Sequence, residues 1–136
     1  MCYSELKSLI PKDKFDLTTI SSLKEISEEK VQPILSELLF WVADMNWPVA
    51  REMVDVLVRF PNSIVPLIKN ILKSSEKDEE WKWFIITGLI PRLSECFQKL
   101  LLEDVFRIIE NPSDSELSGD VWRIAKNYMD EIGCNL

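Results

Sequence analysis

The side chains best suited to chemistry lie in a short acidic segment near the middle of the chain, residues 76–81. It carries Glu76, Asp78, Glu79 and Glu80. Carboxylates this close together could bind a hard cation or act as a general acid and base. Their spacing does not match an EF-hand loop, and the glycine of that loop is missing. Carboxylates at a helix start also interact favourably with the macrodipole, by about 0.3–1 kcal/mol each, so a structural role is the simpler interpretation.

Histidine is absent from the chain. This removes the usual general base near neutral pH and the commonest ligand of transition metals, and it excludes triads that act through histidine. A lysine-activated serine or cysteine is left open, but no motif marks one. The cysteines Cys2, Cys96 and Cys134 are odd in number and far apart, which indicates neither a disulfide framework nor a metal motif. We therefore expect no catalytic residue, no cofactor and no metal site, and a protein that is not an enzyme.

Three tryptophans, Trp47, Trp81 and Trp122, each follow a polar turn. Their rings could form a row on which a ligand stacks. The commoner use of such residues is packing between neighbouring hairpins, with the indole N–H on a turn carbonyl. Asp44 and Asn46 have an equally plain role, because their short side chains bond to free amides in turns and at helix starts.

The charge balance limits the partners that the chain can bind. Sixteen Lys and Arg residues against twenty-three Asp and Glu residues give a net charge of −7. That sign disfavours nucleic acid and anionic membrane surfaces, and it favours solubility or a basic protein partner. No run of about 20 apolar residues could span a bilayer, and no secretory leader is recognisable. With unpaired cysteines, this predicts a cytoplasmic protein.

Helices must position these residues, because the sequence lacks the turn dipeptides of β-hairpins. Apolar residues recur at three- and four-residue steps in five segments, 31–42, 49–60, 64–72, 97–108 and 121–132. A sixth segment, 81–93, is apolar on almost every side, which is typical of a helix covered by neighbours all round. The pattern predicts an all-α fold without a sheet.

Capping and helix-breaking residues lie near the ends of these predicted helices. Ser22 with Glu25 and Ser113 with Glu116 have the spacing of a capping box. Pro48 marks a helix start and Gly133 an end, whereas Pro91 lies where it should bend or end its helix.

The tryptophans also mark a repeat. Trp47 and Trp81 are 34 positions apart, and Trp122 follows 41 positions later, within the range of helical-hairpin repeats. We predict a single domain, 1–136, with a short helical cap over 1–26 and repeats over 27–136. The hairpins would span 29–60, 63–94 and 97–132, stacked as a right-handed, HEAT-like α-α superhelix.

In such a stack every second connection returns to the same side. The turns 44–47, 74–80 and 111–120 should therefore share one edge, where binding residues on a rigid scaffold concentrate. The candidate partner-binding residues are Asp44, Asn46, Trp47, Asp78, Glu79, Glu80, Trp81, Lys82 and Asp120.

Three strings in the chain resemble a known family. They are Ile-Pro-Lys-Asp-Lys at 10–14 followed by Asp16, Trp-Val-Ala-Asp-Met-Asn-Trp-Pro-Val-Ala at 41–50, and Trp-Lys at 81–82. The chain is similar over most of its length to the bacterial domain-of-unknown-function family numbered five-zero-seven-one. The resemblance implies a helical, HEAT-like fold and no established activity, so it assigns no role to any residue. Lys12, Asp13, Lys14 and Asp16 are expected to tie the cap to the first repeat through exposed ion pairs.

Two functional hypotheses follow. The first is a non-catalytic protein-interaction module with a basic protein partner, and one form of it is a bacterial immunity or inhibitor protein. The alternative is a small-molecule or nucleotide-related binder, or an enzyme, that uses the Asp and Trp residues at the turns. The oligomeric state is left open.

Overall fold

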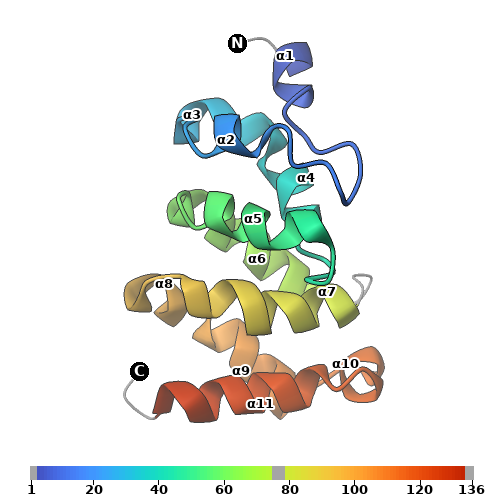
Figure 1. Ribbon diagram of the computed structural model, residues 1–136. Helices are drawn as coiled ribbons and strands as arrows, with labels where there is room; N and C mark the ends of the chain where they lie inside the picture. Colours follow the sequence, from blue (N-terminus) through green and yellow to red (C-terminus); the bar gives the residue numbers. More distant parts are fainter. Residues whose placement is uncertain (1–2, 75–78, 134–136) are drawn as a thin grey trace. The chain divides into compact units, whose positions relative to one another are not determined.

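The computed structural model describes residues 3–74 and 79–133. Its regular structure is helical, and no strand occurs among the described residues, which confirms the predicted all-α class (Figure 1). None of these helices is both long and apolar enough to cross a membrane. The chain divides into two compact units, Met1–Ile64 and Val65–Leu136, each described below by itself. The single domain over 1–136 stays a prediction.

The first unit is built from short helices and one long one. Its elements are α1 (Tyr3–Lys7), α2 (Ile20–Leu23), α3 (Glu28–Val31), a 3₁₀ turn (Gln32–Ile34), α4 (Leu35–Phe40) and α5 (Pro48–Leu57), and α6 (Pro61–Lys73) begins in it. The 3₁₀ turn contains Pro33, which has no N–H for an α-helical bond, so the ladder between α3 and α4 is interrupted there.

Helix α5 begins where the sequence predicts, with Pro48 as its first residue. Proline suits this position because its fixed φ is already helical and its missing N–H would have no helical partner. Val49, Met53, Val56 and Leu57 are buried on one face. This spacing produces the apolar stripe that forms the core of the unit.

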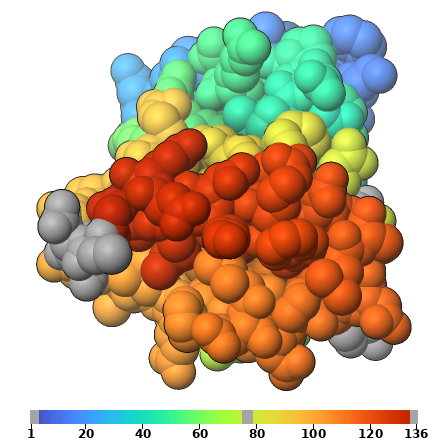
Figure 2. Space-filling view, turned by 90° about the horizontal axis from the view of Figure 1, so that it is seen from below, coloured from blue at the N-terminus to red at the C-terminus, as the bar shows by residue number. Residues whose placement is uncertain are grey.

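The second unit continues from α6. Its elements are α7 (Glu79–Phe84), a π-helical turn (Ile85–Leu89), a 3₁₀ turn (Ile90–Arg92), α8 (Glu95–Lys99), α9 (Leu102–Glu110), α10 (Asp114–Ser118) and α11 (Val121–Ile132). Helix α11 packs along α9 and follows α10. Figure 2 shows α11 beside the segment from α9 to α10 on one face of this unit.

The segment 79–92 changes its hydrogen-bond pattern twice before it ends. In the π-helical turn the N–H of Ile90 donates to the carbonyl of Ile85, five residues back. Pro91 then has no N–H to donate, so the helix closes with a 3₁₀ turn and ends at Arg92, which confirms the predicted stop. The residues that are buried here are Ile85, Ile86, Leu89 and Ile90.

One of the two predicted capping boxes is present. Ser113 accepts a hydrogen bond from the N–H of Glu116, whose side chain accepts one from the N–H of Ser113. The box predicted at Ser22 and Glu25 is wrong, because Ser22 lies inside α2. The cap in that region is Ser27, which accepts a hydrogen bond from the N–H of Lys30 at the start of α3.

Candidate functional site

In the first unit, residues 10–16, one of the segments that resemble the family, form a loop that is hydrogen-bonded to the start of α5. The N–H of Val49 donates to the carbonyl of Lys14 at 3.0 Å. Trp47 is the N-cap residue of α5 and makes no side-chain cap bond. The loop therefore supplies a main-chain acceptor to an amide that a helix start leaves without an internal partner. This bond, rather than the expected ion pairs, links the loop to α5, and the division into a cap and repeats stays a prediction.

Two aspartates hold the loop in shape. Asp16 accepts hydrogen bonds from the N–H of Lys12 at 3.0 Å and from the N–H and hydroxyl of Thr18 at 3.1 and 2.6 Å. These bonds, that of the Thr18 hydroxyl foremost, lower the pKa of Asp16 below its ordinary value. Asp13 accepts from the N–H of Phe15 at 2.9 Å. The carboxylates at 13 and 16 thus act on the backbone of their own loop.

The turn before α5 is formed as the sequence predicts. Oδ1 of Asp44 accepts from the N–H of Asn46 at 2.8 Å, and the carbonyl of Asp44 accepts from the N–H of Trp47 at 3.1 Å. Asp44 is therefore a turn residue. Asn46 is exposed. It does not hold the cap position, which belongs to Trp47.

Three aromatic rings cluster beside this turn. The ring centroids of Phe40, Trp41 and Trp47 lie 5.6 to 5.8 Å apart, with Trp41 and Trp47 in an edge-to-face arrangement. Trp47 and Trp41 are half-buried, whereas 47% of Phe40 is exposed. Trp47 therefore packs against its two neighbours and is still partly accessible, and its role in binding stays a prediction.

In the second unit, the start of α7 lies against the end of α10. A Cβ added to Gly119 would stand only 2.5 Å from Cγ of Glu79, so a glycine is required for this close approach. The start of α7 at Glu79 thus adjoins Gly119 in the turn 111–120, whereas residues 75–78 of the turn 74–80 lie outside the described residues. The position of the turn 44–47 relative to them stays a prediction. A hollow of about 260 Å³, here called the acidic hollow, is lined by Glu79, Glu80, Trp83, Phe84 and Gly119.

Lys82 points into the interior of the unit. Its Nζ lies 2.9 Å from Oε2 of Glu116, and the two side chains are 1% and 0% exposed. Arg107 donates to both carboxylate oxygens of Glu116, at 2.5 and 2.8 Å, and to the carbonyl of Leu72 at 2.7 Å. Lys82 is a predicted partner-binding residue, and because its side chain is buried, a contact with a partner would require this ion pair to open. The feature of the sequence that could have indicated a buried ion pair is a lysine inside an otherwise apolar segment.

The hydrogen bonds to Glu116 overcome the cost of its burial. Burial alone would raise its pKa, because it disfavours the charged form. The bonds from Arg107, Lys82 and the N–H of Ser113 lower it instead, to about 2. Glu116 is thus a fixed anion that joins α7, α9 and the start of α10.

The remaining candidate residues differ in their exposure. Glu80 is exposed, whereas Glu79 and Trp81 are half-buried. Asp120 is exposed and adopts φ 62°, a left-handed conformation that aspartate tolerates better than most residues, and it lies 3.5 Å from Arg123. Asp78 lies outside the described residues.

The described residues contain no group of three or more His, Cys, Asp or Glu side chains that could hold a metal ion. Cys96 is an exposed, free thiol on α8. The other two cysteines, Cys2 and Cys134, lie outside the described residues, as does the carboxylate of Glu76 at the acidic segment.

Comparison with curated proteins gave no match. The model of one family matches residues 9–129, which is most of the chain and includes the loop at 11–18, the turn at 44–47 and the ion pair of Lys82 with Glu116. The chain therefore belongs to the family described as Domain of unknown function (DUF5071).

Proposed function

We propose that this protein is a non-catalytic protein-interaction module, a HEAT-like stack of helical hairpins that presents an acidic edge to a basic protein partner. The observation that carries the proposal is the acidic hollow at the start of α7. Its walls combine two carboxylates, Glu79 and Glu80, with two aromatic rings, Trp83 and Phe84.

The stacking part of the proposal is supported by the spacing of contacts along the chain. In the first unit, Arg59 donates to the carbonyls of Leu23 and Ile26, which lie 36 and 33 positions away. In the second unit, Lys82 reaches Glu116 over 34 positions. Nearly equal separations are expected where each hairpin contacts the next, as in helical repeats.

The side chains of the acidic hollow indicate the chemistry of the partner. Aromatic side chains provide the large contact areas that dominate interface energies, and a rim of carboxylates selects and steers a positively charged partner. The net charge of −7 acts in the same direction at longer range. A toxin-neutralising immunity or inhibitor protein, acting in the cytoplasm, is one concrete form of this module.

The alternative is a small-molecule or nucleotide-related binder, or an enzyme, at the turns. The first unit offers less support for it, because the carboxylate of Asp44 is engaged by the N–H of Asn46 and those of Asp13 and Asp16 by their own loop.

The test is a charge reversal in the acidic hollow, Glu79→Lys with Glu80→Lys. The matched control is Glu95→Lys with Glu103→Lys, which changes the net charge equally. Each control residue also lies in the first turn of its helix, so the same kind of helix-dipole interaction is lost. Both variants are immobilised, checked for helicity by circular dichroism, and used to capture proteins from the organism of origin at low and moderate salt.

We expect the wild type and the control to retain one basic protein that the hollow variant loses, with capture weakening as salt rises. Equal capture by the two folded variants would place the partner site elsewhere. A metabolite that copurifies with the wild type, in place of a protein, would favour the alternative function.

A further inference from the structure

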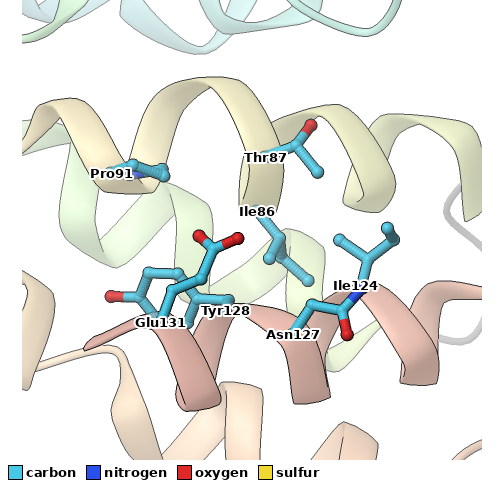
Figure 3. Close-up of a pocket in the computed structure, with 7 residues that line it drawn as sticks. All are labelled: Ile86, Thr87, Pro91, Ile124, Asn127, Tyr128 and Glu131. Atoms are coloured by element: carbon cyan, nitrogen blue, oxygen red, sulfur yellow. The ribbon is translucent and has the colours of Figure 1, made fainter. Parts of the chain in front are cut away.

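A pocket in the second unit lies between the π-helical turn and α11, away from the acidic hollow. It has a volume of about 180 Å³ and is lined by Ile86, Thr87, Pro91, Ile124, Asn127, Tyr128 and Glu131 (Figure 3). Ligand pockets for drug-sized molecules commonly measure about 300–1,000 Å³. This one therefore suits a single side chain or a small molecule rather than a nucleotide.

The two hydroxyl groups that line the pocket donate their hydrogen bonds elsewhere. The hydroxyl of Thr87 donates to the carbonyl of Trp83 at 2.9 Å. The hydroxyl of Tyr128 donates to Oε1 of Gln98 at 2.5 Å, and burial raises the pKa of Tyr128 to about 12. Thr87 and Tyr128 thus contribute mainly carbon atoms to the cavity, next to two isoleucines and a proline.

One charged group stands at the rim. The carboxylate of Glu131 reaches from α11 toward the π-helical turn, as Figure 3 shows. Glu131 and Asn127 are exposed, and neither side chain is hydrogen-bonded or ion-paired to any residue in the described ranges. A carboxylate beside an apolar trough offers a counter-charge to a ligand with an aliphatic body and a cationic end.

The backbone adds to the negative potential at this place. Helix α11 carries no basic residue in its last turn, where Asp130 and Glu131 stand instead, although the carboxyl end of a helix favours cations. The segment 79–92 also contributes its C-terminal half to the pocket, so two helix ends with partial negative charge converge there. Arg92 ends that segment but does not line the pocket.

We propose that this pocket binds an alkylammonium group, with the aliphatic chain between Ile86 and Ile124 and the ammonium at Glu131. Such an amine is charged at neutral pH, since its pKa lies near that of lysine, about 10.4. The group comes either from a free small amine or from a lysine side chain of a protein, and both present the same chemistry. The site is separate from the acidic hollow and does not depend on the proposed function.

The test is a titration followed by NMR of the methyl groups of Ile86 and Ile124. The probes are n-butylammonium, neutral n-butanol and lysine with both its α-amino and carboxyl groups blocked as amides. The variant is Glu131→Gln, which removes the counter-charge. The matched control is Asp130→Asn, which removes the same charge from the neighbouring residue, one that does not line the pocket.

We expect both ammonium probes to shift the two methyl signals in a saturable way and butanol to bind more weakly. Glu131→Gln should weaken butylammonium about fivefold, as for a partly exposed ion pair, while Asp130→Asn leaves it nearly unchanged. Equal binding of butanol and butylammonium, equal effects of the two variants, or unmoved methyl signals would each overturn the proposal. Tighter binding of the blocked lysine than of butylammonium would identify a protein side chain as the source, and the reverse order a free amine.

Discussion

Replacing Glu116 by glutamine should destabilise the second unit strongly. The variant keeps the size of the side chain but removes the negative charge. Lys82, 1% exposed, then loses the counter-ion that its buried ammonium group has among the described residues. Removing one partner of a buried pair is costly because the other charge is left uncompensated, and losses of about 3–5 kcal/mol are typical.

The pKa of Glu116 gives an independent magnitude. It falls from the ordinary 4.5 to about 2 in the folded protein. Each pKa unit corresponds to about 1.4 kcal/mol, so the ionised form contributes about 3 kcal/mol to the free energy of unfolding at pH 7. Since the folded pKa is depressed, this contribution is fully present above pH 4.5 and is lost as the pH falls toward 2.

The assay is urea unfolding of wild type and Glu116→Gln, followed by circular dichroism at several pH values. The difference in unfolding free energy should be about 3 kcal/mol at pH 7 and about 1 kcal/mol at pH 3, where the unfolded wild type is already protonated. Glu110→Gln, an exposed carboxylate on α9, is the control and should change stability by less than about 0.5 kcal/mol. A loss below about 1 kcal/mol at pH 7, or a loss independent of pH, would refute the reasoning.

Two further predictions concern single contacts. Arg59→Ala should lower the free energy of unfolding by about 1–2 kcal/mol and increase amide exchange in α2 and α3, because the guanidinium binds the carbonyl of Leu23 in α2 and that of Ile26 just before α3. The control is Arg51→Ala, at an exposed residue on α5, which should change little. Equal amide exchange in the two variants would contradict this prediction. Gly119→Ala should destabilise the protein by about 1–3 kcal/mol in thermal unfolding, because the added Cβ would collide with Glu79. An unchanged Tm would show that α10 can shift to accommodate the methyl group.

Local patterns in the sequence were sufficient to predict those helices that bury one face. The three- and four-residue steps predicted α5 and α11, and Pro91 predicted the end of the segment 79–92. The capping box at Ser113 was predicted for the same reason, since a cap depends on residues within one turn. The π-helical turn was not predicted, because its extra residue is accommodated by packing that no local pattern reports.

The candidate site was predicted less well, because its decisive contacts join distant positions. Nothing near Lys82 in the sequence indicates that its counter-ion is Glu116. The link between the loop and α5 uses the carbonyl of Lys14, and a main-chain atom has no sequence signature. Asp44 was identified correctly as a turn residue because its hydrogen bond is made two positions away.

The nearly constant spacing of contacts has a consequence for the order of folding. The entropy lost on closing a loop grows only as about (3/2)RT ln n with its length. Three links close loops of 35, 36 and 35 residues at nearly the same entropic cost. They are the bond of Val49 to Lys14, that of Arg59 to Leu23 and, in the second unit, an ion pair of Lys69 with Asp104 at 3.0 Å. None of these closures has to precede another on entropic grounds, so loop closure alone does not fix a starting point for folding in either unit.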